Sequence, residues 1–188
     1  MFPDWISPEQ AAQLEAHYAL LVLWNRKLNL ARMGSRTEAI ERHYNESLFL
    51  ARHLPPGPLK IADIGSGAGF PGLPVAIVRP DCSLTLVESR QKKAAFLREA
   101  SRNLPNVDVF AHRAEESEAF FDWAISRAVS YEDLRPLLAR LAPNAALLTG
   151  AEEPPAALGF LGLDWDSPLL LPGSKQRFLR VGHRKCFT

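Results

Sequence analysis

The sequence predicts an α/β fold in which helices cover a buried, mainly parallel sheet, and three observations support this prediction. Short apolar runs alternate with helical segments after residue 58, a pattern typical of βαβ units. A glycine-rich loop follows directly after the first of these runs. Before them, the Pro-Pro-Gly-Pro segment at residues 55–58 ends a helical N-terminal part. We therefore expect one structural domain, with a helical extension at residues 1–54 packed on a core at residues 59–188.

Two helices are expected in the extension. The first begins at Ser7, whose side chain suits the N-cap, with Pro8 at the first helical position and Gln10 completing a capping box. Asn25 lies on the apolar stripe of this helix, and we expect its amide to tie the helix to a neighbouring loop. The second helix is expected over Thr37–His53.

The core is expected to contain five strands, three helices and a closing hairpin. The strands are expected at Leu59–Ile64, Ser83–Glu88, Val107–Phe110, Asp122–Ser126 and Ala145–Thr149. The helices are expected at about Gly72–Arg79, Gln91–Asn103 and Tyr131–Ala142. The hairpin is expected to pair Leu169–Leu171 with Arg177–Gly182, and residues 151–157 are expected to form an exposed loop.

The composition is that of an ordinary folded protein. Hydrophobic residues make up 47% of the 188 residues, enough to build a full core, which excludes a disordered chain. Lysines and arginines number 22 against 21 acidic residues, so the net charge of +1 excludes a uniformly basic nucleic-acid coat.

Membrane and metal-binding classes are also disfavoured. No apolar run approaches the roughly 20 residues that span a bilayer, and the N-terminus lacks the pattern of a signal peptide. Cys82 and Cys186 form neither a metal-ligand spacing nor a disulfide framework. We expect a cytoplasmic monomer that binds no metal and no membrane.

The segment from Asp63 to Gly72, Asp-Ile-Gly-Ser-Gly-Ala-Gly-Phe-Pro-Gly, predicts a nucleoside-binding loop. Alternate glycines let the backbone approach a ligand closely and turn sharply into a helix. Glu88 ends the second strand, where a carboxylate accepts hydrogen bonds from both hydroxyls of a ribose. The stretch that begins at Gly67 matches the G-x-G-x-x-G pattern of nicotinamide dinucleotide sites, whereas Asp63, two residues before Gly65, favours S-adenosylmethionine.

Several motifs occur in one order and at one spacing. They are Trp-Asn-Arg-Lys-Leu-Asn-Leu at 24–30, Glu-Arg-His at 41–43, the glycine-rich segment extended to Pro74, Arg-Ala-Glu-Glu at 113–116 and Ser-Arg-Ala at 126–128. From about Leu14 to Gly150 the chain closely resembles the ribosomal RNA small subunit methyltransferase G family, also called glucose-inhibited division protein B. The resemblance implies a Rossmann-like class I methyltransferase fold and methyl transfer from S-adenosylmethionine, leaving S-adenosylhomocysteine. The implied target is N7 of guanine 527, in the 530 loop of the 16S rRNA of the small ribosomal subunit.

The resemblance also implies roles for individual residues. Expected at the cofactor site are Asp63, Gly65, Gly67, Gly69, Phe70, Glu88, Ala114, Glu115 and Arg127. Glu88 holds the ribose in this scheme, and Ala114 and Glu115 flank the adenine. Arg127, at the end of the fourth strand, reaches the methionine end or the incoming base, and Arg127 and Arg113 are the candidate catalytic residues. Phe70 is equally compatible with a structural role in the core, and Arg113 with a surface ion pair.

Basic residues in two parts of the chain are the candidates for contacts with RNA phosphates. They are Arg26, Lys27, Arg42 and His43 in the extension, and Lys175, Arg177 and Arg184 near the C-terminus. Guanine N7 carries a lone pair in the ring plane, so its methylation needs alignment rather than removal of a proton.

Two alternative functions stay open. Where the resembled family has Lys-Gly after the fifth strand, this chain has Thr149-Gly150, which is compatible with a catalytically weakened RNA-binding or assembly protein. An NADP-dependent oxidoreductase is supported by the second glycine match, but the sequence lacks the Tyr-x-x-x-Lys pair that such an enzyme uses.

Overall fold

The computed structural model describes residues 2–150 and 162–184. The extension consists of α1 (Pro8–Leu28), α2 (Arg36–Ala39), the π-helical turn η1 (Ile40–Asn45) and α3 (Glu46–His53). The core helices are α4 (Gly72–Val78), α5 (Gln91–Ala100), the 3-10 turn η2 (Ala114–Glu116) and α6 (Tyr131–Leu141). The strands are β1 (Lys60–Ile64), β2 (Ser83–Val87), β3 (Val107–Phe110), β4 (Trp123–Arg127), β5 (Asn144–Thr149), β6 (Leu163–Trp165), β7 (Leu169–Leu170) and β8 (Phe178–Arg184). The alternation of strands and helices is confirmed, and the loop expected at 151–157 lies outside the described residues.

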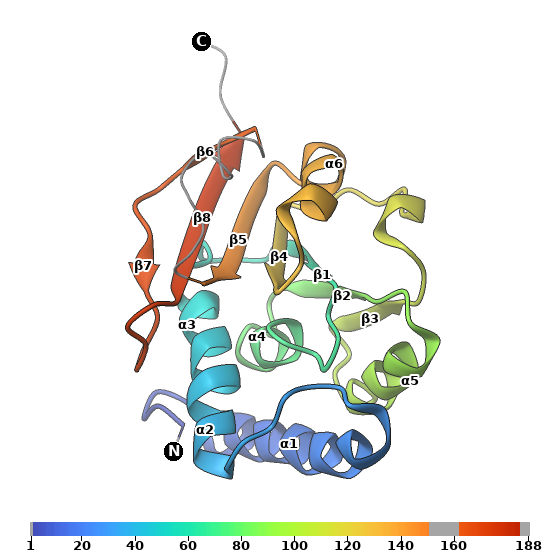
Figure 1. The fold of residues 1–188 in the computed structure, drawn as a ribbon, viewed down its shortest axis with the longest axis vertical. Coiled ribbons are helices and arrows are strands. Elements are labelled where there is room, and N and C mark those ends of the chain that lie inside the picture. Colours follow the sequence, from blue (N-terminus) through green and yellow to red (C-terminus); the bar gives the residue numbers. More distant parts are fainter. Residues whose placement is uncertain (1, 151–161, 185–188) are drawn as a thin grey trace.

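The strands form one sheet in the order β3-β2-β1-β4-β5-β8-β6, with β7 pairing on β8 (Figure 1). Strands β1 to β5 pair in parallel, and β8 runs antiparallel to β5, β6 and β7. The predicted closing hairpin is therefore present as β7 and β8, whereas β6 was not predicted. The order of the strands reverses between β1 and β4, and open α/β sheets bind ligands outside the carboxyl ends of the strands at such a point.

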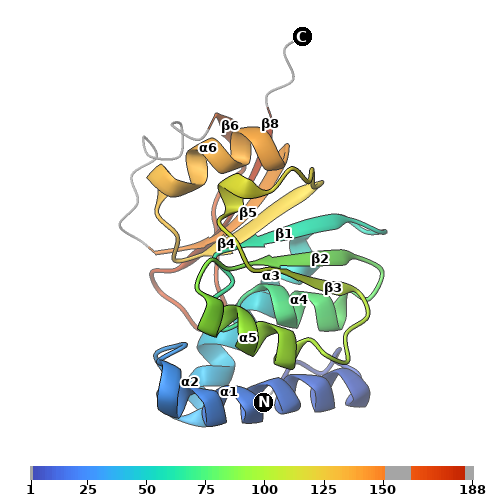
Figure 2. The ribbon, with the colours of Figure 1, turned by 90° about the vertical axis from the view of Figure 1, so that its right-hand side faces the viewer.

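Helices cover both faces of the sheet. In Figure 2, α6 lies on one face, and α4 and α5 lie on the other with α1 packed beneath them. Along β1, Ile61 belongs to the core on the side of α1, α4 and α5, and its neighbour Ala62 belongs to the core under α6. This alternation follows from the strand, whose successive side chains point to opposite faces. The result is the doubly wound α/β architecture that the sequence predicts.

The first helix is held at both ends by the residues that the sequence singles out. Ser7 Oγ accepts a hydrogen bond from the backbone N–H of Gln10 at 3.2 Å, and Gln10 Oε1 accepts one from the N–H of Ser7 at 3.0 Å, which confirms the capping box. Asn25 Nδ2 donates to the carbonyl of Ala31 at 2.9 Å, and its Oδ1 accepts from the N–H of Ala31 at 3.0 Å. The amide therefore ties α1 to the following loop, as predicted.

The helix predicted over Thr37–His53 is present but contains the π-helical turn η1. Such a turn includes one more residue than an α-helical turn, and the consecutive residues His43 and Tyr44 are both buried. The centroid of the Tyr44 ring lies 4.9 Å from that of Phe70 in the glycine-rich loop. The sequence did not predict the π turn because apolar periodicity is read against 3.6 residues per turn.

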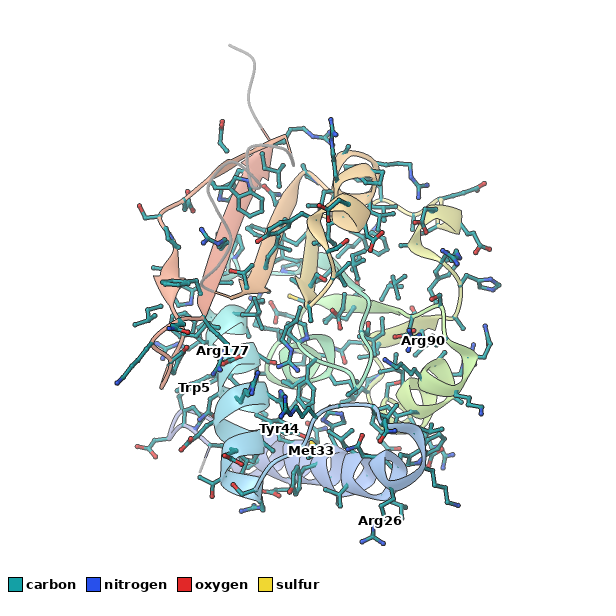
Figure 3. The ribbon with its side chains drawn as sticks, viewed as in Figure 1. Trp5, Arg26, Met33, Tyr44, Arg90 and Arg177 are labelled. Carbon is teal, nitrogen blue, oxygen red and sulfur yellow. The ribbon has the colours of Figure 1, made fainter. Side chains whose placement is uncertain are left out.

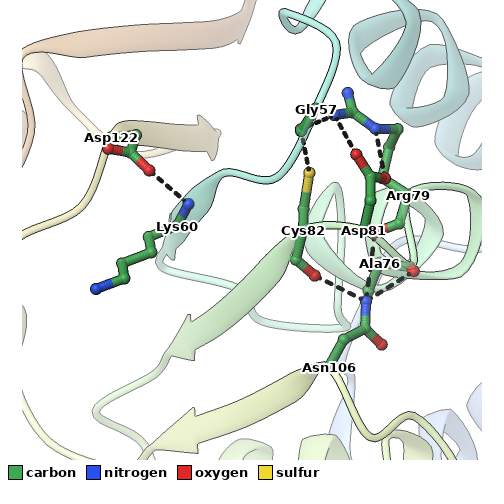
Figure 4. A network of polar contacts seen from close by, with 8 residues as sticks. All are labelled: Gly57, Lys60, Ala76, Arg79, Asp81, Cys82, Asn106 and Asp122. Carbon is green, nitrogen blue, oxygen red and sulfur yellow. Dashed lines mark hydrogen bonds and ion pairs between the residues drawn. The ribbon is translucent and has the colours of Figure 1, made fainter.

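A polar network lies near the amino-terminal ends of β1 and β2, away from the glycine-rich loop (Figure 4). Asn106 Nδ2 donates to the carbonyl of Cys82 at 3.1 Å. The Arg79 guanidinium donates to both carboxylate oxygens of Asp81 at 2.9 Å and to the carbonyl of Gly57 at 2.7 Å. These contacts tie the turn after α4 to the segments that precede β1 and β3, so their role is structural.

Candidate active site

The glycine-rich loop begins where β1 ends, at the carboxyl edge of the sheet. Gly65, Gly67 and Gly69 have φ angles of 72°, 57° and 86°, in the left-handed region that other residues rarely adopt. The loop turns tightly, because the carbonyl of Ser66 accepts from the N–H groups of Gly69 at 2.7 Å and Phe70 at 3.2 Å. The backbone of the turn therefore requires these alternating glycines, whatever ligand approaches it.

Asp63 supports the loop from inside the fold. Its side chain is fully buried, and Oδ2 accepts from the N–H of Gly72 at 3.1 Å. Loss of water around the carboxyl raises the pKa of Asp63 to about 7. A Cβ at Gly72 would come within 2.5 Å of the same carboxylate oxygen, so glycine at this position lets the end of the loop close on Asp63.

Glu88 lies beside the loop, immediately after β2. Its Oε2 accepts from the N–H of Gly67 at 3.0 Å, and its Oε1 accepts from the N–H of Arg90 at 2.9 Å. Each carboxylate oxygen retains the capacity for a further hydrogen bond. Glu88 therefore shapes the loop and still has acceptors for the hydroxyls of a ligand.

A cleft of about 540 Å³ opens between the loop, the carboxyl ends of β4 and β5, and the extension. Of the predicted site residues, Gly65, Gly67, Phe70, Arg127, Arg42, His43 and Arg177 line it. Arg32 and Lys93 add two further cations, and Glu46 is the single acidic side chain among the described residues that line the cleft. Its walls are therefore strongly positive, which suits an anionic ligand.

Phe70 lines the cleft and contacts two other side chains that line it. The guanidinium carbon of Arg127 lies 5.2 Å from the centroid of the Phe70 ring, in the range of a cation–π contact. The ring of His43 stacks on Phe70 with centroids 5.1 Å apart and planes 28° apart. Phe70 is only 3% exposed, so its side chain belongs to the buried core and also borders the cleft.

Arg127 and His43, which line the cleft and contact Phe70, differ in charge. Burial lowers the pKa of Arg127, but a guanidinium stays protonated in proteins, and Arg127 Nη1 donates to the carbonyl of Arg42 at 3.4 Å. Burial and the nearby charge of Arg127 lower the pKa of His43 to about 4. His43 is therefore neutral near pH 7, with Nε2 lying 3.3 Å from the carbonyl of Arg32.

An ion pair closes another side of the cleft. Arg177 Nε donates to Glu46 Oε1 at 2.6 Å and joins α3 to the segment before β8, 131 positions later in the chain. The Glu46 side chain is 2% exposed, and its burial raises its pKa while Arg177 opposes this shift. Arg177 thus has a structural partner in addition to its predicted place at the RNA interface.

Three predicted residues lie after β3, at the same edge of the sheet but outside the lining of the cleft. Ala114 is buried, and its carbonyl accepts from Arg140 Nη2 at 2.9 Å. Arg113 and Glu115 are exposed. Asp63, Gly69 and Glu88 also lie outside the lining of the cleft. Asp63 is buried under the loop, Gly69 belongs to the loop itself, and Glu88 contacts the loop from the end of β2.

The predicted RNA-binding residues are spread over several surfaces. Arg26 and Lys27 are exposed at the end of α1, and Figure 3 shows Arg26 pointing away from the molecule while Arg177 lies near the end of α3. Lys175 is exposed in the turn between β7 and β8. Arg184 lies at the opposite end of β8, where its Nη2 donates to the carbonyl of Ala139 at 2.9 Å.

Lys93 lines the cleft but was not among the residues that the sequence predicted. Its Nζ lies 3.9 Å from the place that a Cβ on Gly67 would occupy. Lys93 belongs to the first turn of α5, where a cation opposes the helix dipole. A lysine at this electrostatically unfavourable position is the feature of the sequence from which a functional role could have been predicted.

Within residues 2–150 and 162–184, no group of three or more His, Cys, Asp or Glu side chains is arranged to hold a metal ion. In the same part of the chain, no helix has the length and apolar character needed to cross a bilayer.

Comparisons with solved structures support the fold. A SAM-dependent methyltransferase from Aquifex aeolicus superposes with a TM-score of 0.62 at 15% identity, covering 77% of this chain and 92% of that protein. The N-methyltransferase NodS from Bradyrhizobium japonicum WM9, solved in complex with S-adenosyl-L-homocysteine, gives 0.62 at 14% identity and covers 89% and 99%. This chain therefore has the Rossmann-like fold of these methyltransferases.

Sequence comparisons give the family. Ribosomal RNA small subunit methyltransferase G of Mycoplasma capricolum is 38% identical over 146 residues, which cover 70% of this chain and 63% of that protein. The protein of the same name from Methylobacillus flagellatus is 43% identical over 126 residues, covering 65% and 60%. This chain therefore spans less than two thirds of the length of these relatives. The family model described as rRNA small subunit methyltransferase G matches residues 10–143, and the chain belongs to this family.

Proposed function

We propose that this chain transfers a methyl group from S-adenosylmethionine to N7 of one guanine of 16S rRNA, guanine 527 in the 530 loop. The observation that carries the proposal is the positive cleft in front of β1 and β4, with the glycine-rich loop on one side and Arg127 on the other. Membership of the family supports the choice of rRNA as substrate.

The residues of the loop fit a nucleoside cofactor. A Cβ added at Gly67 would meet its nearest neighbours, the Gly65 carbonyl and Lys93 Nζ, only at 3.7 and 3.9 Å, so the space in front of this glycine is open to a ligand. S-adenosylmethionine supplies a methyl group on a positively charged sulfonium. Glu88 would hold its ribose through the acceptor capacity that remains on the carboxylate.

The other side of the cleft suits an extruded nucleotide. Cations attract the phosphates, and a base must leave its stack to enter a pocket of this kind. Arg127 offers a rigid set of donors that recognises a phosphate or the oxygen of a guanine. Arg127 stays charged, so it cannot accept a proton, and guanine N7 already carries a lone pair. The role of Arg127 is therefore to align the base rather than to remove a proton.

Thr149 stands where the resembled family has lysine, and a cation lies next to it. Arg180 Nε donates to Thr149 Oγ1 at 3.2 Å. We propose that Arg180, which contacts Thr149 but does not itself line the cleft, supplies the positive charge next to this position. An active methyltransferase is then compatible with threonine at position 149.

The test is transfer of labelled methyl from S-adenosylmethionine to small-subunit particles that lack the modification, followed by nuclease digestion. We expect 7-methylguanosine from a single 16S position. Gly67→Val is the negative control. Its side chain fills the space expected for the cofactor and also strains a turn whose φ of 57° favours glycine, so it should abolish both binding and transfer, with circular dichroism to check the fold. Cofactor binding without transfer by the wild type would support the assembly protein, and absence of cofactor binding would refute the proposal.

A further inference from the structure

His17 is a buried histidine of α1 that the proposed reaction does not use. Its side chain is 3% exposed and is buried where α1 and η1 pack against the glycine-rich loop. His17 Nε2 is 3.0 Å from the carbonyl oxygen of Ala68, in the middle of that loop. His17 Nδ1 is 2.9 Å from the hydroxyl of Tyr44 in η1.

The two contacts determine the state of the imidazole. A carbonyl oxygen can only accept, so Nε2 must carry the hydrogen that it donates to Ala68. Nδ1 then accepts from the Tyr44 hydroxyl. Burial lowers the pKa of His17 to about 4, so the ring is neutral near pH 7 with both nitrogens satisfied.

The ring of His17 also packs against the aromatic residue that follows the glycines. Its centroid lies 5.2 Å from that of Phe70 in an edge-on arrangement, and Tyr44 contacts both His17 and Phe70. One buried side chain of α1 therefore contacts the loop through a hydrogen bond and through a ring.

The loop has particular need of such contacts. Its three glycines adopt left-handed φ angles, and glycine loses more conformational freedom on ordering than any other residue. A loop that is ordered before the ligand arrives lowers the entropy cost of binding. The contacts that order it from outside include Glu88 at Gly67 and His17 at Ala68.

We propose that His17 is a positioning residue through which the N-terminal helix holds the glycine-rich loop in its cofactor-binding conformation. The inference rests on the proposed function, since it concerns the affinity of the same cofactor site. Because the contact does not involve the reacting atoms, its loss raises the dissociation constant and the KM for cofactor and leaves the rate at saturating cofactor nearly unchanged.

The experiment compares three substitutions by calorimetric titration with S-adenosylhomocysteine. In His17→Gln the amide nitrogen reaches the place of Nε2 and keeps the donor to Ala68. In His17→Asn the amide lies near the place of Nδ1 and does not reach Ala68, and His17→Leu removes both polar contacts. We expect His17→Gln to bind within about threefold of the wild type, and the other two to bind about tenfold more weakly.

Leu21→Ala is the matched control, because it removes a fully buried side chain from the same helix. It should lower the melting temperature and leave the dissociation constant within about threefold of the wild type. At saturating cofactor, methyl transfer by His17→Asn should also stay within about threefold.

The outcomes separate the two proposals. Equal binding by the wild type, His17→Asn and His17→Leu would overturn the positioning role, as would an equal loss of affinity in Leu21→Ala. A wild type that fails to bind S-adenosylhomocysteine refutes the proposed function instead. If the leucine variant does not fold, the comparison of glutamine with asparagine still decides, since only the glutamine restores the donor.

Discussion

At the scale of single residues, burial shifts ionisable groups around the glycine-rich loop in opposite directions. His17 and His43 have pKa values lowered to about 4, because burial disfavours the charged imidazolium. Asp63 has a pKa raised to about 7, because burial disfavours the carboxylate. These three buried groups are therefore less charged near pH 7 than they would be in water.

These shifts predict how stability depends on pH. In the unfolded chain a histidine takes up its proton near pH 6.5, but His17 and His43 in the folded chain do so only near pH 4. Each of them therefore lowers the free energy of unfolding as the pH falls from 6.5 to 4. Asp63 has the opposite effect, because its contribution is present below pH 3.8 and is lost as the pH rises to about 7.

We therefore expect two variants to depart from the wild type in opposite directions between pH 6.5 and 4. In His17→Gln the free energy of unfolding should fall less on acidification, and in Asp63→Asn it should fall more. Denaturant unfolding at a series of pH values measures this. Parallel pH profiles for all three proteins would contradict the proposed titrations.

At the scale of elements, the Glu46–Arg177 ion pair is the contact that joins α3 to the segment before β8. Glu46 is buried whereas the Arg177 side chain is 34% exposed. Removing the arginine leaves a buried carboxylate without its partner, and this costs more than removing both charges.

Arg177→Met should accordingly lower the free energy of unfolding by about 2 kcal/mol, and the double substitution Glu46→Gln with Arg177→Met should recover part of that loss. Arg102→Met is the control, because its pair with Glu99 lies on the surface and contributes little. Chemical denaturation of the four proteins provides the measurement. Equal losses for Arg177→Met and Arg102→Met would show that the buried pair stabilises the fold no more than a surface pair does.

At the scale of the whole molecule, the sheet separates basic residues that are close in sequence. Phe178 pairs with Thr149 at the carboxyl end of β5, whereas His183 pairs with Asn144 at its amino end. Lys175 therefore lies toward the cleft, and Arg184 lies at the far end of the sheet. An RNA bound across the cleft would contact the first and not the second.

For RNA binding we expect Arg42→Gln and Lys175→Gln each to weaken affinity and to reduce the slope of log affinity against log salt by about one. Arg184→Gln should leave both quantities nearly unchanged. Filter binding or fluorescence anisotropy at several salt concentrations measures the slopes. An effect of Arg184→Gln as large as that of Lys175→Gln would indicate that the RNA binds to a different face of the protein.

Local signals explain why much of the fold was predictable. The Ser7–Gln10 capping box, the loop-binding amide of Asn25 and the β7–β8 hairpin are all present, because each depends on residues near to one another in the chain. The strand β6 and the turns η1 and η2 were not predicted. They are short or lack an apolar period, so sequence patterns carry little information about them.

Some features of the candidate site were likewise predictable from local sequence, and others were not. The sequence by itself determined the glycine-rich loop and the position of Arg127 at the end of β4, since both follow from short motifs and from the parallel sheet. Only the tertiary structure decided that Lys93 lines the cleft, that Glu46 holds Arg177 and that His17 reaches the carbonyl of Ala68, 51 positions away. Such contacts join residues far apart in the chain, and their hydrogen bonds form only when packing has brought the elements together and excluded water.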